Sequence, residues 1–198
     1  VDAAKEAGLA EPHIPVVFDA KLGHIMDMVA AGAAGGAVGD YDKDGDLDIF
    51  VNNAKTGTPN HLWRNEGGMR FADVAKAAGV ADMNTAHSTS AGGLFVDYDG
   101  DGWDDLFVFQ MGVSRLMRNR GDGTFEDVTD KAGLAKLYRN TLSGVAFDAD
   151  RDGDIDLYLG AYFPDRDMFD LKDDKVMHDS WEKSRNGGSN VYLRNNGN

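Results

Sequence analysis

The sequence predicts an all-β fold built from repeated four-stranded antiparallel sheets. A nine-residue loop with five aspartates occurs three times in the 198-residue chain, and each copy lies between two short runs of strand-like, apolar composition. The loops begin at residues 40, 97 and 148, so the repeat is about 50 residues long. A sheet of this size cannot bury both of its faces alone, and we therefore expect neighbouring sheets to stack.

The first complete unit is predicted over residues 35–81. Its first two strands are the runs at 35–39 and 47–52, on either side of the acidic loop. A third strand leads into the turn Arg64-Asn65, and a fourth begins at Phe71. The turn residues between these runs favour hairpins, which makes the unit antiparallel.

The same order of elements predicts two further units. The second covers residues 90–135, with its turn at Arg118-Asn119 and a fourth strand from Phe125. The third covers residues 142–198 and carries its turn at Arg194-Asn195, with an insertion at 165–188. Residues 1–10 match the end of a preceding unit, and 11–34 form a connection.

Stacked four-stranded sheets at this period are typical of β-propeller blades. The chain supplies about three and a half blades, whereas closed propellers have about 4–8. We therefore expect a segment of a roughly seven-bladed propeller in a longer protein, with the rest of the ring coming from the same or another chain. Both the connection and the insertion, which contains Phe169 and Trp181, are either solvated excursions or binding loops.

The three acidic loops predict metal binding. Each has carboxylates at positions 1, 3, 5 and 9 and a glycine at position 6, a spacing that wraps oxygen ligands around a hard cation. The glycines, Gly45, Gly102 and Gly153, allow the positive φ of a sharp turn. The backbone carbonyl of position 7 is a further candidate ligand. The candidate metal residues are Asp40, Asp42, Asp44, Asp46, Asp48, Asp97, Asp99, Asp101, Trp103, Asp105, Asp148, Asp150, Asp152, Asp154 and Asp156.

A Ca²⁺ site explains the sequence of these loops better than an EF-hand, a metal-free acidic hairpin or a Mg²⁺ site does. An EF-hand needs a bidentate Glu at position 12, but that position holds Val51, Val108 and Leu159 here, each in a predicted strand. Four carboxylates on one tight loop repel each other unless a cation offsets them, which disfavours a metal-free acidic hairpin. Mg²⁺ prefers shells that keep several waters. We therefore expect about three Ca²⁺ sites, closed at position 9.

Composition excludes several other classes of protein. The net charge of −14 is local, because the three loops hold 15 of the 34 acidic residues and only two bases, Lys43 and Arg151. The residues outside the loops contain no stripe of basic side chains that could bind phosphate groups, so nucleic acid is not an expected partner. The chain has no cysteine and no apolar run long enough to span a membrane. It begins with Val, so we expect a processed or missing N-terminus.

We expect structural rather than functional roles for the repeated arginines, the tryptophans and the histidines. The repeated Arg64, Arg118 and Arg194 are expected to pair with a neighbouring blade or turn rather than to bind an anion. Trp63 and Trp103 lie within repeat elements and are expected in the core. The five histidines share no ligand spacing, and no catalytic triad or Gly-x-Ser-x-Gly arrangement is present.

The unit from Gly35 through Asp40 to Val51, the Arg-Asn-x-Gly turn and the run from Phe125 to Leu134 together resemble the FG-GAP/VCBS repeats of integrin-α-like β-propellers. The resemblance is greatest to bacterial proteins that carry an ASPIC/UnbV domain and to cartilage-acidic-protein-like proteins. It implies Ca²⁺ in the hairpin loops, a protein or glycan partner, and a secreted, periplasmic or cell-surface location.

The first hypothesis for function is a non-enzymatic, calcium-stabilised propeller module for binding or assembly in an extracytoplasmic protein. The alternatives are the propeller portion of a secreted polysaccharide-active enzyme, and a structural subunit of a surface filament or membrane-associated complex. Fold alone does not choose among them.

Overall fold

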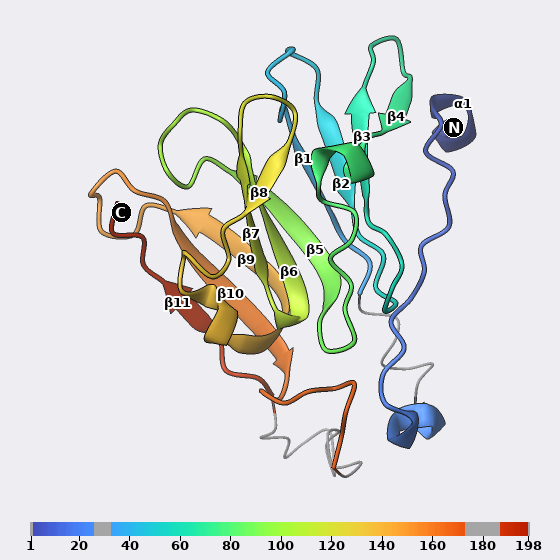
Figure 1. Ribbon diagram of the computed structural model, residues 1–198, viewed down its shortest axis with the longest axis vertical. Coiled ribbons are helices and arrows are strands. Elements are labelled where there is room, and N and C mark those ends of the chain that lie inside the picture. The colour runs from blue at the N-terminus through green and yellow to red at the C-terminus, as the bar shows by residue number, and fades with distance from the viewer. Residues whose placement is uncertain (1, 26–32, 173–186, 198) are drawn as a thin grey trace.

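The chain is all-β, as predicted from the sequence. The computed structural model describes residues 2–25, 33–172 and 187–197. Its strands pair antiparallel throughout the described part (Figure 1). In chain order they are β1 (Gly36–Gly39), β2 (Asp48–Val51), β3 (His61–Asn65), β4 (Phe71–Asp73), β5 (Thr89–Val96), β6 (Asp105–Val113), β7 (Arg115–Asn119), β8 (Phe125–Asp127), β9 (Tyr138–Phe147), β10 (Asp156–Phe163) and β11 (Val191–Leu193).

The strands form three units in the predicted order. Unit one is the four-stranded sheet β1-β2-β3-β4, and unit two has the same order in β5-β6-β7-β8. Unit three contributes β9, β10 and β11. Each acidic loop joins the first two strands of its unit, so the loops occupy equivalent places in successive sheets.

Units two and three also share a backbone ladder that was not predicted from the sequence. Strand β6 runs past its partner β7 to Val113, and its last residues pair with the beginning of β9, with Met111 opposite Asn140 and Val113 opposite Tyr138. The apolar pattern at 105–109 ends before this extension. The ladder depends on where β9 lies in space, which the sequence of β6 alone does not specify.

The three units lie side by side in a fan, with their innermost strands β1, β5 and β9 next to one another (Figure 1). Glycines allow this approach: a Cβ atom on Gly93 would lie 2.9 Å from the ring of Phe50, and one on Gly144 would lie 2.8 Å from the ring of Phe109. The glycine-rich runs before each loop therefore serve packing between units. The arrangement is consistent with a β-propeller segment, and the described strands do not close a ring.

Apolar side chains between the units form two core clusters. Phe50, Leu62, Leu106 and Met117 are buried between units one and two. The second cluster, between units two and three, comprises Phe107, Phe109, Leu116, Val128, Leu157 and Leu159. Unit two thus buries one face against each of its neighbours, as expected for stacked blades, whereas the outer face of unit three exposes Val145, Tyr158 and Tyr192.

Short helical turns follow the fourth strands. Helix α3 (Ala75–Ala78) ends unit one, the 3₁₀ turn η3 (Leu134–Lys136) ends unit two, and α1 (Ala4–Ala7) packs beside unit one. Helices α1 and α3 are each followed by a glycine, Gly8 and Gly79, with a φ of 81°. Both glycines adopt the left-handed conformation that caps the C-terminus of a helix. Residues 2–9 therefore lie where the end of a preceding unit would lie.

The connection and the insertion pack against each other in a third cluster. Val16, Phe18 and Leu22, the last within the 3₁₀ turn η1 (Ala20–Ile25), are buried with Met168 and Leu171 of the insertion. The described part of the insertion is therefore packed rather than a solvated excursion. Trp181 lies outside the described residues. None of the helices in the described part is long and apolar enough to cross a membrane.

Candidate metal centres

The three acidic loops fold in the same way at their tips. Loop one is residues 40–48, loop two is 97–105 and loop three is 148–156. The glycine at position 6 has a φ of 94° in Gly45, 87° in Gly102 and 96° in Gly153, as predicted. In each loop its N–H donates to the carboxylate at position 1, at 2.9 Å between Gly102 N and Asp97 Oδ2. The position 1 aspartate therefore fixes the turn that gathers the other ligands.

Three carboxylates converge in each loop. Their oxygens lie within 4.8 Å of one another in three groups, which comprise Asp40, Asp42 and Asp48 in loop one, Asp97, Asp99 and Asp101 in loop two, and Asp148, Asp150 and Asp152 in loop three. Loop one thus includes the predicted position 9, whereas loops two and three use position 5. Asp44, Asp46 and Asp154, the carbonyl of Trp103, and Asp105 and Asp156 lie outside these groups and remain predicted ligands.

Position 9 also has a structural role that the sequence did not reveal. Asp48, Asp105 and Asp156 are buried, each at 0–1% exposure. In loop two, Asp105 Oδ2 accepts the N–H of Tyr98 at position 2, and Oδ1 accepts the N–H of Asn119 at 2.7 Å. The same two bonds recur in the other two loops. Position 9 therefore ties each loop to the Arg-Asn turn that follows or ends the third strand of its own unit.

Burial of position 9 raises the pKa of two of these carboxyls. Desolvation raises the pKa of Asp48 to about 6 and that of Asp105 to about 7, and nearby loop carboxylates add to the rise. At Asp156, burial acts in the same direction but is outweighed by hydrogen bonds from Asn195 and Tyr192, so its pKa lies below the usual value. The ionised forms of Asp48 and Asp105 are thus disfavoured in the metal-free loops, and a bound cation would offset this cost.

The asparagines of the second and third Arg-Asn turns connect successive loops, whereas Asn65 in the first turn donates to the carbonyl of Leu47 in its own loop. Asn119 Nδ2 donates to the carbonyl of Asp104 in its own loop and, at 2.8 Å, to the carbonyl of Tyr41 in loop one. Asn195 Nδ2 likewise donates to the carbonyl of Tyr98 in loop two at 2.6 Å. The sequence showed that these asparagines repeat, but not that they join the metal loop of one unit to that of the next.

The repeated arginines contact their own units. Arg118 Nε lies 2.6 Å from Asp99 Oδ2 and its Nη2 lies 3.1 Å from Asp101 Oδ2, so its guanidinium covers two candidate ligands of loop two. Arg194 pairs in the same way with Asp150 and Asp152 in loop three. Arg64 instead binds Glu66 in its own turn, at 2.6 Å. We predicted pairing with a neighbouring blade or turn, and the described partners all lie within the same unit.

A basic side chain links loop one to loop two. Lys43 Nζ lies 4.2 Å from the ring centroid of Trp103, a cation–π contact between units. Trp103 is half-buried at the loop surface rather than in the core, where the sequence had placed it, because position 7 lies in the loop before β6 begins. Trp63 is buried, as predicted.

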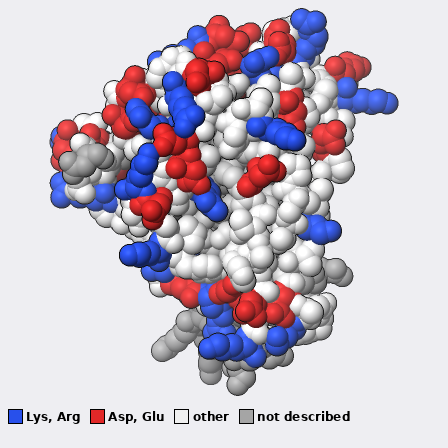
Figure 2. Space-filling view, in the orientation of Figure 1, with Lys and Arg blue, Asp and Glu red and all other residues white. Residues whose placement is uncertain are grey.

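The donor set fits a hard cation. Asp42 Oδ1 and Asp97 Oδ1 are buried carboxylate oxygens without a hydrogen-bond partner among the described residues. A buried carboxylate oxygen is costly when it is left unpaired, and oxygen-only donors are the ligands that Ca²⁺ prefers. Acidic side chains are dense along the upper and left margins of the molecule, where the loops lie, with Lys and Arg beside them (Figure 2).

Residues 97–159, which include all of loops two and three, match the model of the FG-GAP-like repeat. The chain contains an FG-GAP-like repeat. The match begins at Asp97, the first residue of loop two, and covers the strands that carry the second core cluster.

Two curated relatives share part of this sequence. Cartilage acidic protein 1 from Homo sapiens is 30% identical over 96 residues, which is 48% of this chain and 14% of that protein. Cartilage acidic protein 1 from Xenopus tropicalis is 30% identical over 133 residues, or 65% of this chain and 19% of that protein. The chain therefore spans less than a fifth of the length of the relatives it matches.

Proposed function

We propose that this chain is a calcium-binding, non-enzymatic β-propeller module that serves protein or glycan binding, or assembly, in an extracytoplasmic protein. The observation that carries the proposal is that three carboxylates, always including those at positions 1 and 3, converge in the equivalent loop of three successive sheets. An acidic cluster that arose by chance would not recur at the same hairpin of each unit.

Calcium has a structural role in this proposal. Loop one would hold its ion with Asp40, Asp42 and Asp48, and the two other groups would act in the same way in their loops. Because position 9 joins each loop to its Arg-Asn turn, and Asn119 and Asn195 join loops two and three to the loop before them, an ion in one loop also supports the contact between units. An ion at ten times its dissociation constant adds about 1.4 kcal/mol per site.

The non-enzymatic assignment is supported by the engagement of the loop carboxylates. Asp105 and Asp156 accept backbone N–H groups, and Asp99 and Asp101 are covered by Arg118. These groups are arranged to hold the loops rather than to act as a free acid and base on a substrate. For a location outside the cytoplasm we expect each loop to bind Ca²⁺ with a dissociation constant of about 0.1–1 mM, the range typical of extracellular modules.

Isothermal titration calorimetry and thermal unfolding test the proposal. We expect about three Ca²⁺ ions per chain, and a melting temperature about 10 °C lower in excess chelator than in saturating calcium. Asp42→Asn should remove one site. The matched control is Asp82→Asn, at an exposed acid outside the loops, which should keep all three. An absence of binding heat together with an unchanged melting temperature would refute the calcium role.

A further inference from the structure

Arg118 pairs with two of the three carboxylates that converge in loop two. Its Nε lies 2.6 Å from Asp99 Oδ2, and its Nη2 lies 3.1 Å from Asp101 Oδ2. A guanidinium and a metal cation on the same oxygens carry like charges and repel each other. Arg118 therefore has to give up these oxygens, at least in part, for loop two to bind Ca²⁺.

Unit one shows the equivalent arginine with a different partner. Arg64 is the counterpart of Arg118, and its Nη2 lies 2.6 Å from Glu66 Oε1. Among the described residues it forms no ion pair with a carboxylate of loop one. Loop one is also the loop whose converging group includes the buried Asp48. The arginine of the turn thus has two kinds of partner in this molecule, the carboxylates of the loop or a glutamate beside it.

Unit two has a glutamate placed to receive Arg118. Glu126 of β8 lies directly opposite Arg118 of β7 in the antiparallel pair, so the two side chains share a face of the sheet. In unit one the same place is taken by Ala72, which lies opposite Arg64 and carries no charge. Asp99, Arg118 and Glu126 also line one cavity, which leaves room for the guanidinium to turn from one carboxylate to the other.

Glu126 already attracts basic side chains. Its Oε1 lies 2.5 Å from Lys131 Nζ, and its Oε2 lies 3.9 Å from Arg120 Nη2. Lys131 lowers the pKa of Glu126 most, and the charges of Arg120 and Arg118 act in the same direction. Exposed ion pairs of this kind contribute little to stability, so one base can replace another at the same carboxylate.

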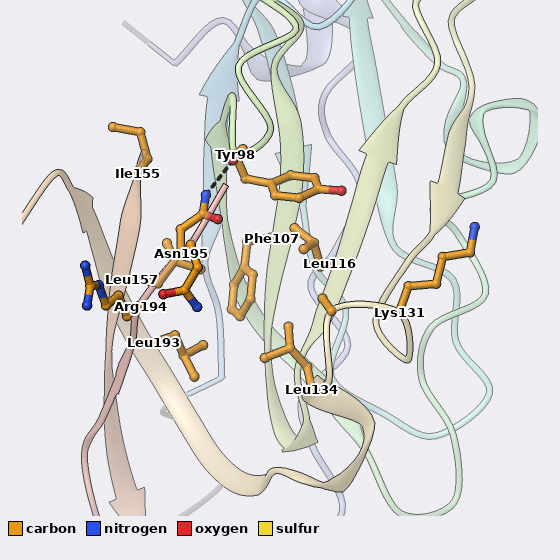
Figure 3. Close-up of a pocket in the computed structure, with 12 residues that line it drawn as sticks. Tyr98, Phe107, Leu116, Lys131, Leu134, Ile155, Leu157, Leu193, Arg194 and Asn195 are labelled. Atoms are coloured by element: carbon orange, nitrogen blue, oxygen red, sulfur yellow. Dashed lines mark hydrogen bonds between the residues drawn. The ribbon is translucent and has the colours of Figure 1, made fainter. Parts of the chain in front are cut away.

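Lys131 is free to leave Glu126. It stands at the margin of an apolar cavity of about 280 Å³ beside Tyr98, and its ammonium group points away from the leucine side chains that line this cavity (Figure 3). Its side chain is 72% exposed, and Glu126 is its ion-pair partner among the described residues. The release of Lys131 to solvent therefore leaves the core unchanged.

We propose that Arg118 is a two-position switch, which moves from Asp99 and Asp101 to Glu126 when loop two binds Ca²⁺ and thereby releases Lys131. The switch rests on the calcium binding proposed above, and it carries the occupancy of one loop to the surface of β8. Because Glu126 offers the displaced guanidinium a new partner, it favours calcium in loop two. By linkage, the factor that Glu126 adds to the calcium affinity is the factor by which calcium favours the pairing of Arg118 with Glu126.

Calorimetry tests the contribution of Glu126 on a chain in which Asp40→Asn and Asp148→Asn leave loop two as the calcium site. Glu126→Gln should lower the calcium affinity about two- to fivefold, as expected for one exposed ion pair. In an Arg118→Ala background the same change should have no effect. The matched control, Asp130→Asn, neutralises an exposed acid without an ion pair among the described residues and should leave the affinity unchanged. Equal losses in both backgrounds would overturn the switch.

Side-chain NMR tests the movement itself. Titration of Ca²⁺ into the same chain should shift the signals of Arg118 Nε–H and of the Lys131 ammonium group with the midpoint of the binding heat, while those of the exposed Lys136 stay unchanged. Arg118→Ala should abolish the shift of Lys131. Binding heat without a shift of Lys131, or a shift that persists in Arg118→Ala, would overturn the switch alone. An absence of binding heat would overturn the calcium role of loop two, and the switch with it.

Discussion

Loop one and loop two have the same pattern of ligands, but different surroundings. In loop one, Tyr41 is stacked under Phe125 of the next unit, while in loop two Tyr98 borders a cavity. The arginines differ as well, because Arg118 forms ion pairs with two carboxylates of loop two, whereas Arg64 forms its ion pair with Glu66 and acts on Asp42 of loop one through its charge alone. The next unit decides how well the tyrosine of a metal loop is packed. The adjacent turn decides whether an arginine pairs with the carboxylates of that loop. Neither is determined by the loop sequence alone.

The two tyrosines give the largest expected difference. Tyr41→Ala should lower the free energy of unfolding by about 4 kcal/mol, because it removes a fully buried ring from a stacked pair. Tyr98→Ala should cost only about 1 kcal/mol, since its ring is half-buried beside an existing cavity. Urea unfolding in saturating calcium measures both. Equal losses would show that the two loops are packed alike.

The asparagines give a smaller difference in stability, and here the variant in unit two is the more costly one. Asn119→Ala should cost about 2 kcal/mol, because it leaves the carbonyls of Tyr41 and Asp104 without their donor in a buried place. Asn65→Ala should cost less than about 1 kcal/mol, since among the described residues its amide donates only to the carbonyl of Leu47 near solvent. The same urea experiment measures both variants, and a larger loss for Asn65→Ala would contradict a role of Asn119 between units.

The arginines give the smallest difference, in calcium affinity rather than in stability. Arg118→Ala should raise the affinity of loop two about two- to fivefold, because it removes a positive charge from Asp99 and Asp101. The effect is limited, since the Arg118 side chain is 43% exposed and screened by solvent. Calorimetry on a chain with Asp40→Asn and Asp148→Asn isolates loop two.

The matched variant for loop one is Arg64→Ala, measured with Asp97→Asn and Asp148→Asn. It should change the affinity of loop one by less than Arg118→Ala changes that of loop two, because Arg64 is already paired with Glu66. A larger gain in loop one would mean that the pairing with Glu66 does not keep Arg64 from the site.

Local pattern by itself determined the all-β class, the order of strands within each unit and the three acidic loops. Alternating and apolar runs, turn residues and the glycine at position 6 act over a few residues, so they can be found without knowing what lies nearby. The positive φ of Gly45, Gly102 and Gly153 follows directly from this local chemistry.

The contacts between residues that are far apart in the chain could be found only from the tertiary structure. It placed position 9 on the N–H groups of the third strand, directed Asn119 to the carbonyl of Tyr41, and extended β6 along β9. It also packed Leu22 of the connection with Met168 of the insertion and left a cavity beside Tyr98. These contacts join residues far apart in the chain, and their geometry depends on how neighbouring sheets stack, which no local pattern encodes.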